Sequence, residues 1–252
     1  MMNTEHAIMD DRMIVEINHL RKGFGKQEVL KNISLKLFNG ENLVVLGKSG
    51  SGKSVLIKCI VRLLNPDNGT IDVLGKKISS LNRKELGELR KKIGFLFQSG
   101  ALYDSMTVKQ NLEFPLLRIK KNYSQKERNE KINEVLENVG LTDALNKMPS
   151  QLSGGMRKRI SLARTIVVDP LIMLYDEPTT GLDPVTSDEI SFLINEVQKK
   201  YKTSSIIITH DIECARNTAN RVMMLKDGEV YREGKLNEFE NSTDPLIKSF
   251  FK

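Results

Sequence analysis

Hydrophobic and polar positions predict strands in the first part of the chain. Residues 33–37 alternate apolar and polar side chains with the two-residue period of a half-buried strand. The dipeptide Asn39-Gly40 is typical of hairpin turns and leads into the continuously apolar run 43–46. We therefore expect an N-terminal antiparallel β subdomain in which this turn joins two strands.

Further apolar runs alternate with helical patterns along the rest of the chain. A strand without polar interruptions is expected where both of its faces are covered, as in parallel sheets. Helix-like patterns between such runs predict an α/β fold with a mostly parallel core sheet. The continuous runs lie at residues 43–46, 93–97, 172–175 and 205–209.

Two helices can be located by the residues at their ends. Ser124 and Glu127 form a capping box before an apolar stripe with helical spacing, and Gly140 is the expected stop. A second apolar stripe follows Pro184. The stretch from about 99 to 165 is the most helical and interrupts the β/α alternation. We expect it to form a small α-helical subdomain inserted into the α/β core.

Length and composition exclude several classes of protein. The chain has 252 residues, of which 39% are apolar. No stretch approaches the roughly 18 uncharged apolar residues that cross a bilayer. Residues 1–12 are polar and unlike a signal peptide, so we expect a tail there and a single domain over residues 13–252. Cys59 and Cys214 lie far apart and suggest neither a zinc site nor a disulfide.

The chain is basic, with a formal net charge of +7. That balance fits nucleic acid, anionic lipid or a phosphorylated small molecule, and it does not choose among them. Two basic clusters, Arg90-Lys91-Lys92 and Arg157-Lys158-Arg159, contain no interleaved aromatic residues. We expect both clusters to be solvated helix faces.

A glycine-rich stretch between an apolar strand and an apolar helix pattern carries the strongest chemical signal. Its spacing is G-x-x-x-x-G-K-S, in which backbone N–H groups and a helix N-terminus face phosphates. Lys53 is expected to reach the β- and γ-phosphates, and the Ser54 hydroxyl to ligate Mg²⁺. The residues expected to bind the nucleotide here are Gly47, Lys48, Ser49, Gly50, Ser51, Gly52, Lys53 and Ser54.

Two acidic residues follow the apolar run 172–175. Asp176 ends a predicted buried strand, where a carboxylate can hold Mg²⁺ in a phosphoryl-transfer site. Glu177 comes next and is placed to orient or deprotonate an attacking water. Beside the glycine-rich stretch, this pair predicts a nucleotide-hydrolysing centre.

A second candidate anion site begins at Ser153, which Gly154 and Gly155 follow at the start of a helical pattern. A serine cap with two glycines exposes backbone N–H groups. One phosphate chain does not need two such helix ends from one subunit. We therefore expect Ser153 to serve the nucleotide of a second copy in a symmetric dimer.

Together these motifs resemble the ATPase subunits of ABC transporters over nearly the whole chain. The resemblance implies that Gln98 is the Q-loop glutamine near Mg²⁺ and the γ-phosphate, and that Ser153 contacts the γ-phosphate in trans. It makes Asp183 the D-loop aspartate, His210 the switch histidine and Phe24 the adenine-stacking aromatic. ATP and Mg²⁺ are the implied ligand and metal. The implied catalytic residues are Lys53, Gln98, Glu177 and His210.

The stretch after Gln98 reads Ser-Gly-Ala-Leu-Tyr, and with residues 152–156 and 244–250 it is similar to Mla-type ATPases. That resemblance implies phospholipid movement between bacterial membranes and a peripheral place on the cytoplasmic face of the inner membrane. The implied partners are transmembrane permease subunits and an Mce-domain protein, with a STAS-domain regulator in some members.

Two other functions stay open. The first is the ATPase of another solute importer or efflux system. The more remote one is a non-transport ABC protein that acts on nucleic acid or the ribosome, which the basic charge suggests. Such proteins typically fuse two ATPase units or insert a coiled coil or zinc module, and neither feature is found in the sequence. We therefore expect no nucleic-acid partner.

Overall fold

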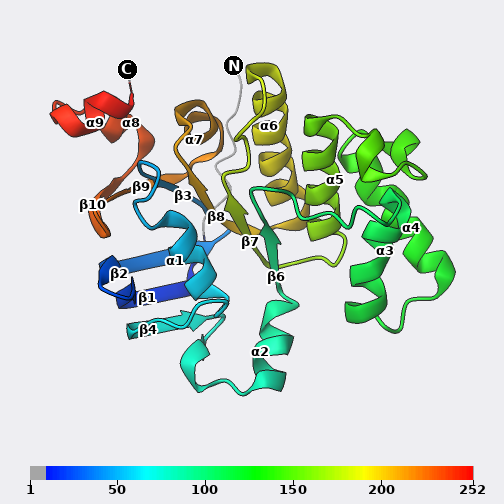
Figure 1. Cartoon of the computed structure of the whole chain (residues 1–252), viewed down its shortest axis with the longest axis horizontal. Helices are drawn as coiled ribbons and strands as arrows, with labels where there is room; N and C mark the ends of the chain where they lie inside the picture. Colours follow the sequence, from blue (N-terminus) through cyan, green and yellow to red (C-terminus); the bar gives the residue numbers. More distant parts are fainter. Residues whose placement is uncertain (1–9, 252) are drawn as a thin grey trace.

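The computed structural model describes residues 10–251 and contains a ten-stranded sheet (Figure 1). The spatial order of the strands is β5-β4-β1-β2-β10-β9-β3-β8-β7-β6. The strand bounds are β1 Asp10–Phe24, β2 Gln27–Asn39, β3 Asn42–Leu46, β4 Asn68–Val73, β5 Lys76–Lys77, β6 Ile93–Leu96, β7 Ile172–Asp176, β8 Ser204–Thr209, β9 Arg221–Lys226 and β10 Glu229–Gly234.

Nine α-helices lie within the described part of the chain, and none of them is long and apolar enough to cross a membrane. Three short 3₁₀ turns, Ile78–Ser80, Thr142–Ala144 and Pro149–Gln151, join some of these elements. The helix bounds are α1 Lys53–Ile60, α2 Arg83–Arg90, α3 Val108–Ile119, α4 Gln125–Asn138, α5 Gly154–Ile166, α6 Pro184–Tyr201, α7 Ile212–Thr218, α8 Leu236–Glu240 and α9 Pro245–Phe250.

The predicted parallel core is confirmed. Strands β6, β7, β8, β3 and β9 pair in parallel, and every residue of β3, β7 and β8 is buried. Leu43 and Val45 belong to the core cluster that contains the buried residues of α1, whereas Val44 and Leu46 belong to the cluster that contains those of α5, α6 and α7. The carboxyl ends of the parallel strands share one edge, where ligands bind in open α/β sheets.

The expected hairpin at Asn39-Gly40 is wrong. Gly40 does turn the chain, with a φ of 72°. However, β2 lies between β1 and β10, while β3 lies between β9 and β8. An all-apolar strand such as β3 needs cover on both faces, and the middle of the sheet provides that cover. Burial of the strand therefore outweighs the local preference of the turn.

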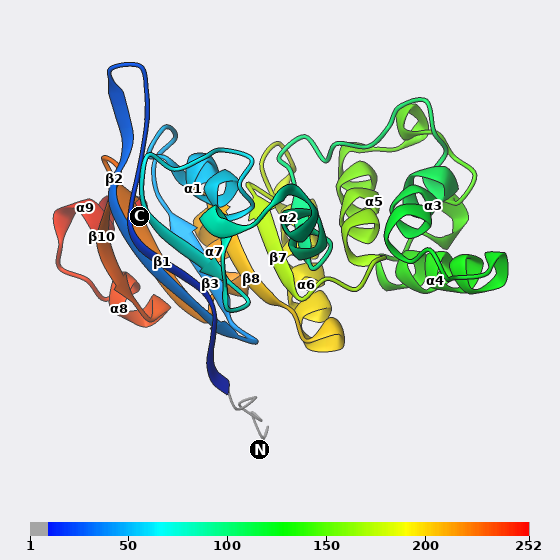
Figure 2. The same cartoon turned by 90° about the horizontal axis from the view of Figure 1, so that it is seen from below.

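The antiparallel N-terminal part is present, but it is built from other strand pairs. β1 pairs with β2 and β4, and β4 pairs with β5, all in antiparallel fashion. The long hairpin of β1 and β2 projects from the body of the molecule (Figure 2). Residues 1–9 of the predicted polar tail lie outside the described residues. β1 begins at Asp10, so the last part of that tail belongs to a strand.

The predicted helix ends are confirmed. Ser124 Oγ accepts a hydrogen bond from the Glu127 N–H, and the Glu127 carboxylate accepts one from the Ser124 N–H. Gly140 follows α4 with a φ of 64°. Helices α3, α4 and α5 lie together beyond the β6 edge of the sheet (Figure 2). On the other side of the molecule, α8 and α9 lie near β9 and β10, which are inner strands of the sheet (Figure 1).

Candidate nucleotide-binding site

The glycine-rich stretch forms the turn between β3 and α1, and its backbone packs tightly. Gly50 and Gly52 have φ values of 81° and 99°, in the left-handed region that favours glycine. A Cβ on Gly47 would lie 2.5 Å from Ser51 Oγ and 2.8 Å from the carbonyl oxygen of Leu225. A side chain there would displace the loop from the end of β9. The strand–loop–helix context that a phosphate-binding loop needs is therefore present.

Lys53, the first residue of α1, holds its ammonium group against this loop. Its Nζ donates to the carbonyl oxygens of Gly47 at 2.7 Å and Lys48 at 3.2 Å. Glu177 Oε1 lies 3.3 Å from the same nitrogen, and the lysine is only 5% exposed. A buried cation with these neighbours can also bind phosphate oxygens, because it has three N–H donors.

Ser54 and Asp176 supply two neighbouring oxygen ligands. Ser54 Oγ donates to Asp176 Oδ1 at 2.9 Å. Neighbouring ligands of an octahedral Mg²⁺ lie about 3 Å apart, since each Mg–O bond is about 2.1 Å. Burial raises the pKa of Asp176, and a divalent cation would favour its ionised form. These two residues therefore fit the metal that the sequence predicts.

Glu177 is held at the carboxyl end of β7. Its φ is 50°, unusual for a residue other than glycine, and its N–H donates to the carbonyl oxygen of Ile208 at 2.9 Å. The carboxylate oxygen Oε2 lies 2.8 Å from His210 Nδ1 and accepts a hydrogen bond from Thr180 Oγ1 at 3.2 Å. With 8% exposure, this fixed carboxylate is placed to orient a water molecule.

A cavity of about 300 Å³ opens over these groups, and we call it the P-loop cavity. Gln98, two residues after the end of β6, and His210, directly after β8, both line it. Its lining residues are Val29, Ser49, Gly50, Gly52, Lys53, Ser54, Val55, Gln98, Glu177 and His210. Residues from three parallel strand ends and the loop thus meet in one place, as the sequence predicts.

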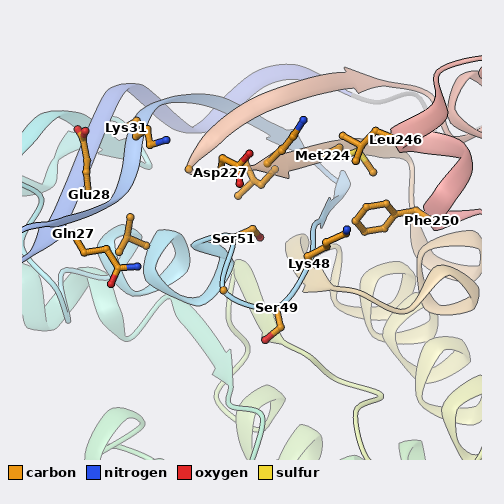
Figure 3. Close-up of a pocket in the computed structure, with 15 residues that line it drawn as sticks. Gln27, Glu28, Lys31, Lys48, Ser49, Ser51, Met224, Asp227, Leu246 and Phe250 are labelled. Carbon is orange, nitrogen blue, oxygen red and sulfur yellow. The ribbon is translucent and has the colours of Figure 1, made fainter.

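Three predicted loop residues do not line the P-loop cavity: Gly47, which lines neither cavity at the loop, and the pair Lys48 and Ser51. This pair lines a neighbouring cavity of about 440 Å³, whose other walls include β2, the β9–β10 turn and Phe250 of α9 (Figure 3). Ser49 and Gly50 line both cavities. Lys48 points toward Phe250 in this view. The side chains of Lys48 and Ser51 are therefore not brought to the predicted nucleotide site, although they belong to its loop.

Phe24 also stays apart from the P-loop cavity. It ends β1 at the tip of the projecting hairpin and is 48% exposed. Its only cation contact among the described residues is with Lys22, whose Nζ lies 5.4 Å from the ring centroid. The exposed ring is free to stack on a base, but the structure does not bring it together with Lys53 and Ser54.

The predicted second anion site lies on a different surface. Ser153 is exposed, caps α5 and lines neither cavity of the loop. A Cβ on Gly155 would lie 2.5 Å from Thr186 Cγ2, so Gly154 and Gly155 lie against the start of α6. Asp183 caps α6 and accepts two hydrogen bonds from Thr186, which lower the pKa of Asp183. Ser153, Gly154, Gly155 and Asp183 are therefore grouped together.

The prediction that Arg157-Lys158-Arg159 forms a solvated helix face is wrong at Lys158. This residue is 6% exposed, and its Nζ donates to the carbonyl oxygen of Gln98 at 2.6 Å. Burial lowers the pKa of Lys158. Nothing in the local sequence separates it from its two neighbours, because its burial depends on where α5 packs. Lys158 is therefore one site residue that the sequence does not predict. Thr180, which donates a hydrogen bond to Glu177, is another.

The fold and the site define a P-loop nucleotide-binding protein. A phosphate-binding loop follows a central parallel strand, and an acidic pair ends the strand two places away in the sheet. The chain belongs to the ABC transporter family, whose model matches residues 30–180.

Comparisons with known proteins agree with this assignment. The chain is 37% identical to Protein TRIGALACTOSYLDIACYLGLYCEROL 3, chloroplastic, from Arabidopsis thaliana, over 96% of this chain and 74% of that protein. It is 36% identical to the methionine import ATP-binding protein MetN of Brucella abortus, over 94% of this chain. The chain spans only 64% of the length of that MetN protein.

A solved structure gives the same fold. It is a dimeric, post-hydrolysis state of the ATP-binding cassette MJ0796 with ADP and Pi bound. The TM-score is 0.81 at 35% identity, and the match covers 88% of this chain and 99% of the other. The chain is therefore an ABC ATPase cassette that uses ATP and Mg²⁺.

Proposed function

We propose that this chain is the ATP-hydrolysing subunit of a membrane transporter and that two copies work head to tail. One observation carries the pairing: Ser153 lies outside the P-loop cavity that Lys53 and Ser54 line. Two copies facing each other allow each Ser153 to complete the partner's site. The dimeric cassette with ADP and Pi supports such an arrangement by similarity.

Nucleotide binding is assigned to the loop and its helix. The backbone N–H groups of residues 47–52 and the Lys53 ammonium hold the phosphates. Ser54, Asp176 and Gln98 are the proposed Mg²⁺ ligands, and the bound metal neutralises charge on the phosphate oxygens. Phe24 supplies an exposed ring for the adenine. The second copy contributes Ser153 with its glycines.

Hydrolysis is assigned to Glu177 and His210. Phosphate oxygens that bind Lys53 replace its 3.3 Å contact with Glu177, which leaves that carboxylate able to accept a proton from water. The water oxygen bonds to the γ-phosphorus while the bond to the β-phosphate oxygen breaks. His210 and Gln98 contact the γ-phosphate as its charge develops. Loss of those contacts then reopens the dimer, and Asp183 links the two sites across the interface.

Phospholipid is the cargo that we infer for the transporter. The support is the similarity of residues 97–103, 152–156 and 244–250 to Mla-type ATPases, together with a relative that carries the name of a glycolipid. The net charge of +7 suits a peripheral place beside the anionic leaflet of an inner membrane. The proposed partners are permease subunits and an Mce-domain protein, with a STAS-domain protein as a regulator.

A second candidate is import of a small solute. The similarity to a methionine import protein favours it, because 94% of this chain matches that relative. The two candidates share the same ATPase chemistry and differ in the proteins that bind the cassette.

Purification of the tagged chain from native membranes in mild detergent separates these candidates. We expect a permease, an Mce-domain protein and bound phospholipid to purify with it, and none of them from an untagged strain. A periplasmic amino-acid receptor in their place contradicts the lipid cargo. Ribosomes or nucleic acid without a permease contradict the transporter assignment.

A further inference from the structure

One side of α5 holds the main chain of two residues that line the P-loop cavity. Lys158 Nζ donates to the carbonyl oxygen of Gln98 at 2.6 Å, and the carbonyl oxygen of Glu177 lies 3.4 Å from the same nitrogen. Both residues line the P-loop cavity. A single buried ammonium group therefore supports the backbone beneath two of the proposed catalytic side chains.

The segments that α5 contacts have unfavourable backbone conformations. Glu177 and Ala101 have φ values of 50° and 52°, and residues other than glycine keep such a conformation only where the surrounding structure holds them in it. A Cβ on Gly100 would lie 2.6 Å from Ser161 Oγ of α5, so the segment after Gln98 presses against the helix. Arg164 of α5 donates to the carbonyl oxygen of Ala101.

The charges around Lys158 indicate a specific place for this cation. The negative charges of Asp176 and Glu177 each raise the pKa of Lys158. Burial lowers that pKa by more, so the net shift is downward. Arg157, its neighbour on the helix, is exposed. A lysine that served only to stabilise α5 would not need acceptors on Gln98 and Glu177, which follow β6 and β7.

We propose that Lys158 is a positioning residue that fixes the main chain of Gln98 and Glu177 so that both side chains point to the γ-phosphate. This role rests on the proposed functions of those two residues. Because Ser153 begins the same helix, a shift of α5 toward the partner's nucleotide also moves the donor that holds this chain's own Gln98 and Glu177. Lys158 thereby links the two half-sites within one chain.

Lys158→Met tests the proposal, with Arg157→Met as a matched control that removes an exposed charge from the same helix. We expect Lys158→Met to lower kcat by about 10- to 100-fold, the scale of a catalytic group misplaced by 1 Å. The KM for ATP and the affinity for a non-hydrolysable ATP analogue should change little. Arg157→Met should keep the wild-type kcat. If Lys158→Met does not fold, Lys158→Gln takes its place. We expect the same result for it, a lower kcat with little change in the KM for ATP.

A kcat for either Lys158 variant that equals the Arg157→Met value overturns the proposal, and so does an equal loss in kcat and in affinity for the analogue. Reduced thermal stability with unchanged kcat per folded molecule assigns Lys158 a structural role and also overturns it. The proposed function fails separately: wild-type turnover that is insensitive to Glu177→Gln contradicts the role of Glu177, whatever Lys158 does.

Discussion

At the scale of single residues, Ser54 and Asp176 show how two distant segments meet at the proposed metal site. Their oxygens lie 2.9 Å apart although 122 positions separate the residues in the chain. Asp176→Asn replaces a charged ligand by a neutral one. We expect the Mg²⁺ concentration for half-maximal ATPase activity to rise by about 10-fold or more. A Mg²⁺ titration of activity measures this, with Asp188→Asn at an exposed position of α6 as the control. An unchanged Mg²⁺ requirement contradicts the assignment.

Two glycines offer a second test at this scale. Gly47→Ala places a Cβ 2.8 Å from the Leu225 carbonyl oxygen and should abolish ATP binding, because the loop must move. Gly87→Ala in α2 meets no heavy atom within 4 Å. It should stabilise the protein by about 0.5–1 kcal/mol, the usual gain of alanine over glycine in a helix. Nucleotide titration and chemical denaturation measure the two effects. Normal ATP binding by Gly47→Ala would show that the loop tolerates the side chain.

The sequence predicts some site residues and misses others for a physical reason. Lys53 and Ser54 are predicted because their spacing from the loop glycines fixes their place. Lys158 is missed because three adjacent basic residues look alike until the packing of α5 is known. Phe24 and Lys48 were expected at the nucleotide, and the structure does not bring their side chains to the P-loop cavity. The proposed roles of these residues stay predictions.

At the scale of elements, an ion pair fastens β9 to the turn between β2 and β3. Arg221 Nε and Nη2 donate to the two carboxylate oxygens of Glu41 at 2.7 and 2.9 Å, and Glu41 is fully buried. Arg221→Met leaves this carboxylate buried without its cation. We expect a loss of about 3–5 kcal/mol in the free energy of unfolding. Chemical denaturation measures it.

The matched variant removes both charges. Glu41→Gln combined with Arg221→Met should lose less stability than Arg221→Met alone, because no unpaired charge stays buried. Arg216→Met, which breaks more exposed ion pairs with Glu213 and Glu240, should change stability little. An equal loss for the single and the double variant would show that the ion pair is not the source of the effect.

Elements could be predicted from sequence where the signal is local. The capping box at Ser124 and the stop at Gly140 depend on a few neighbouring residues, and the structure confirms both. The partner of β3 depends on the whole sheet, so the turn at Asn39-Gly40 gave the wrong pairing. Apolar runs indicate that a strand is covered on both faces, but they do not say which strands lie beside it.

At the scale of the whole molecule, the chain presents two proposed phosphate-binding elements that do not share a cavity. The P-loop cavity contains Lys53 and Glu177, while Ser153 and Asp183 lie together outside it. The α/β class was predictable because the apolar runs recur along the chain. The dimer and the cargo depend on contacts with other chains, so both stay proposals. The domain boundaries at 13–252 and 99–165 stay proposals as well.

The most direct test of the paired sites is the mass of Glu177→Gln in solution with ATP and Mg²⁺. Removal of the proposed proton acceptor should slow hydrolysis and leave ATP bound between two copies. Light scattering should therefore show a dimer with ATP and a monomer without it, and Ser153→Ala in the same background should weaken the dimer. A Glu177→Gln protein that stays monomeric with bound ATP, or that hydrolyses ATP at the wild-type rate, contradicts the account.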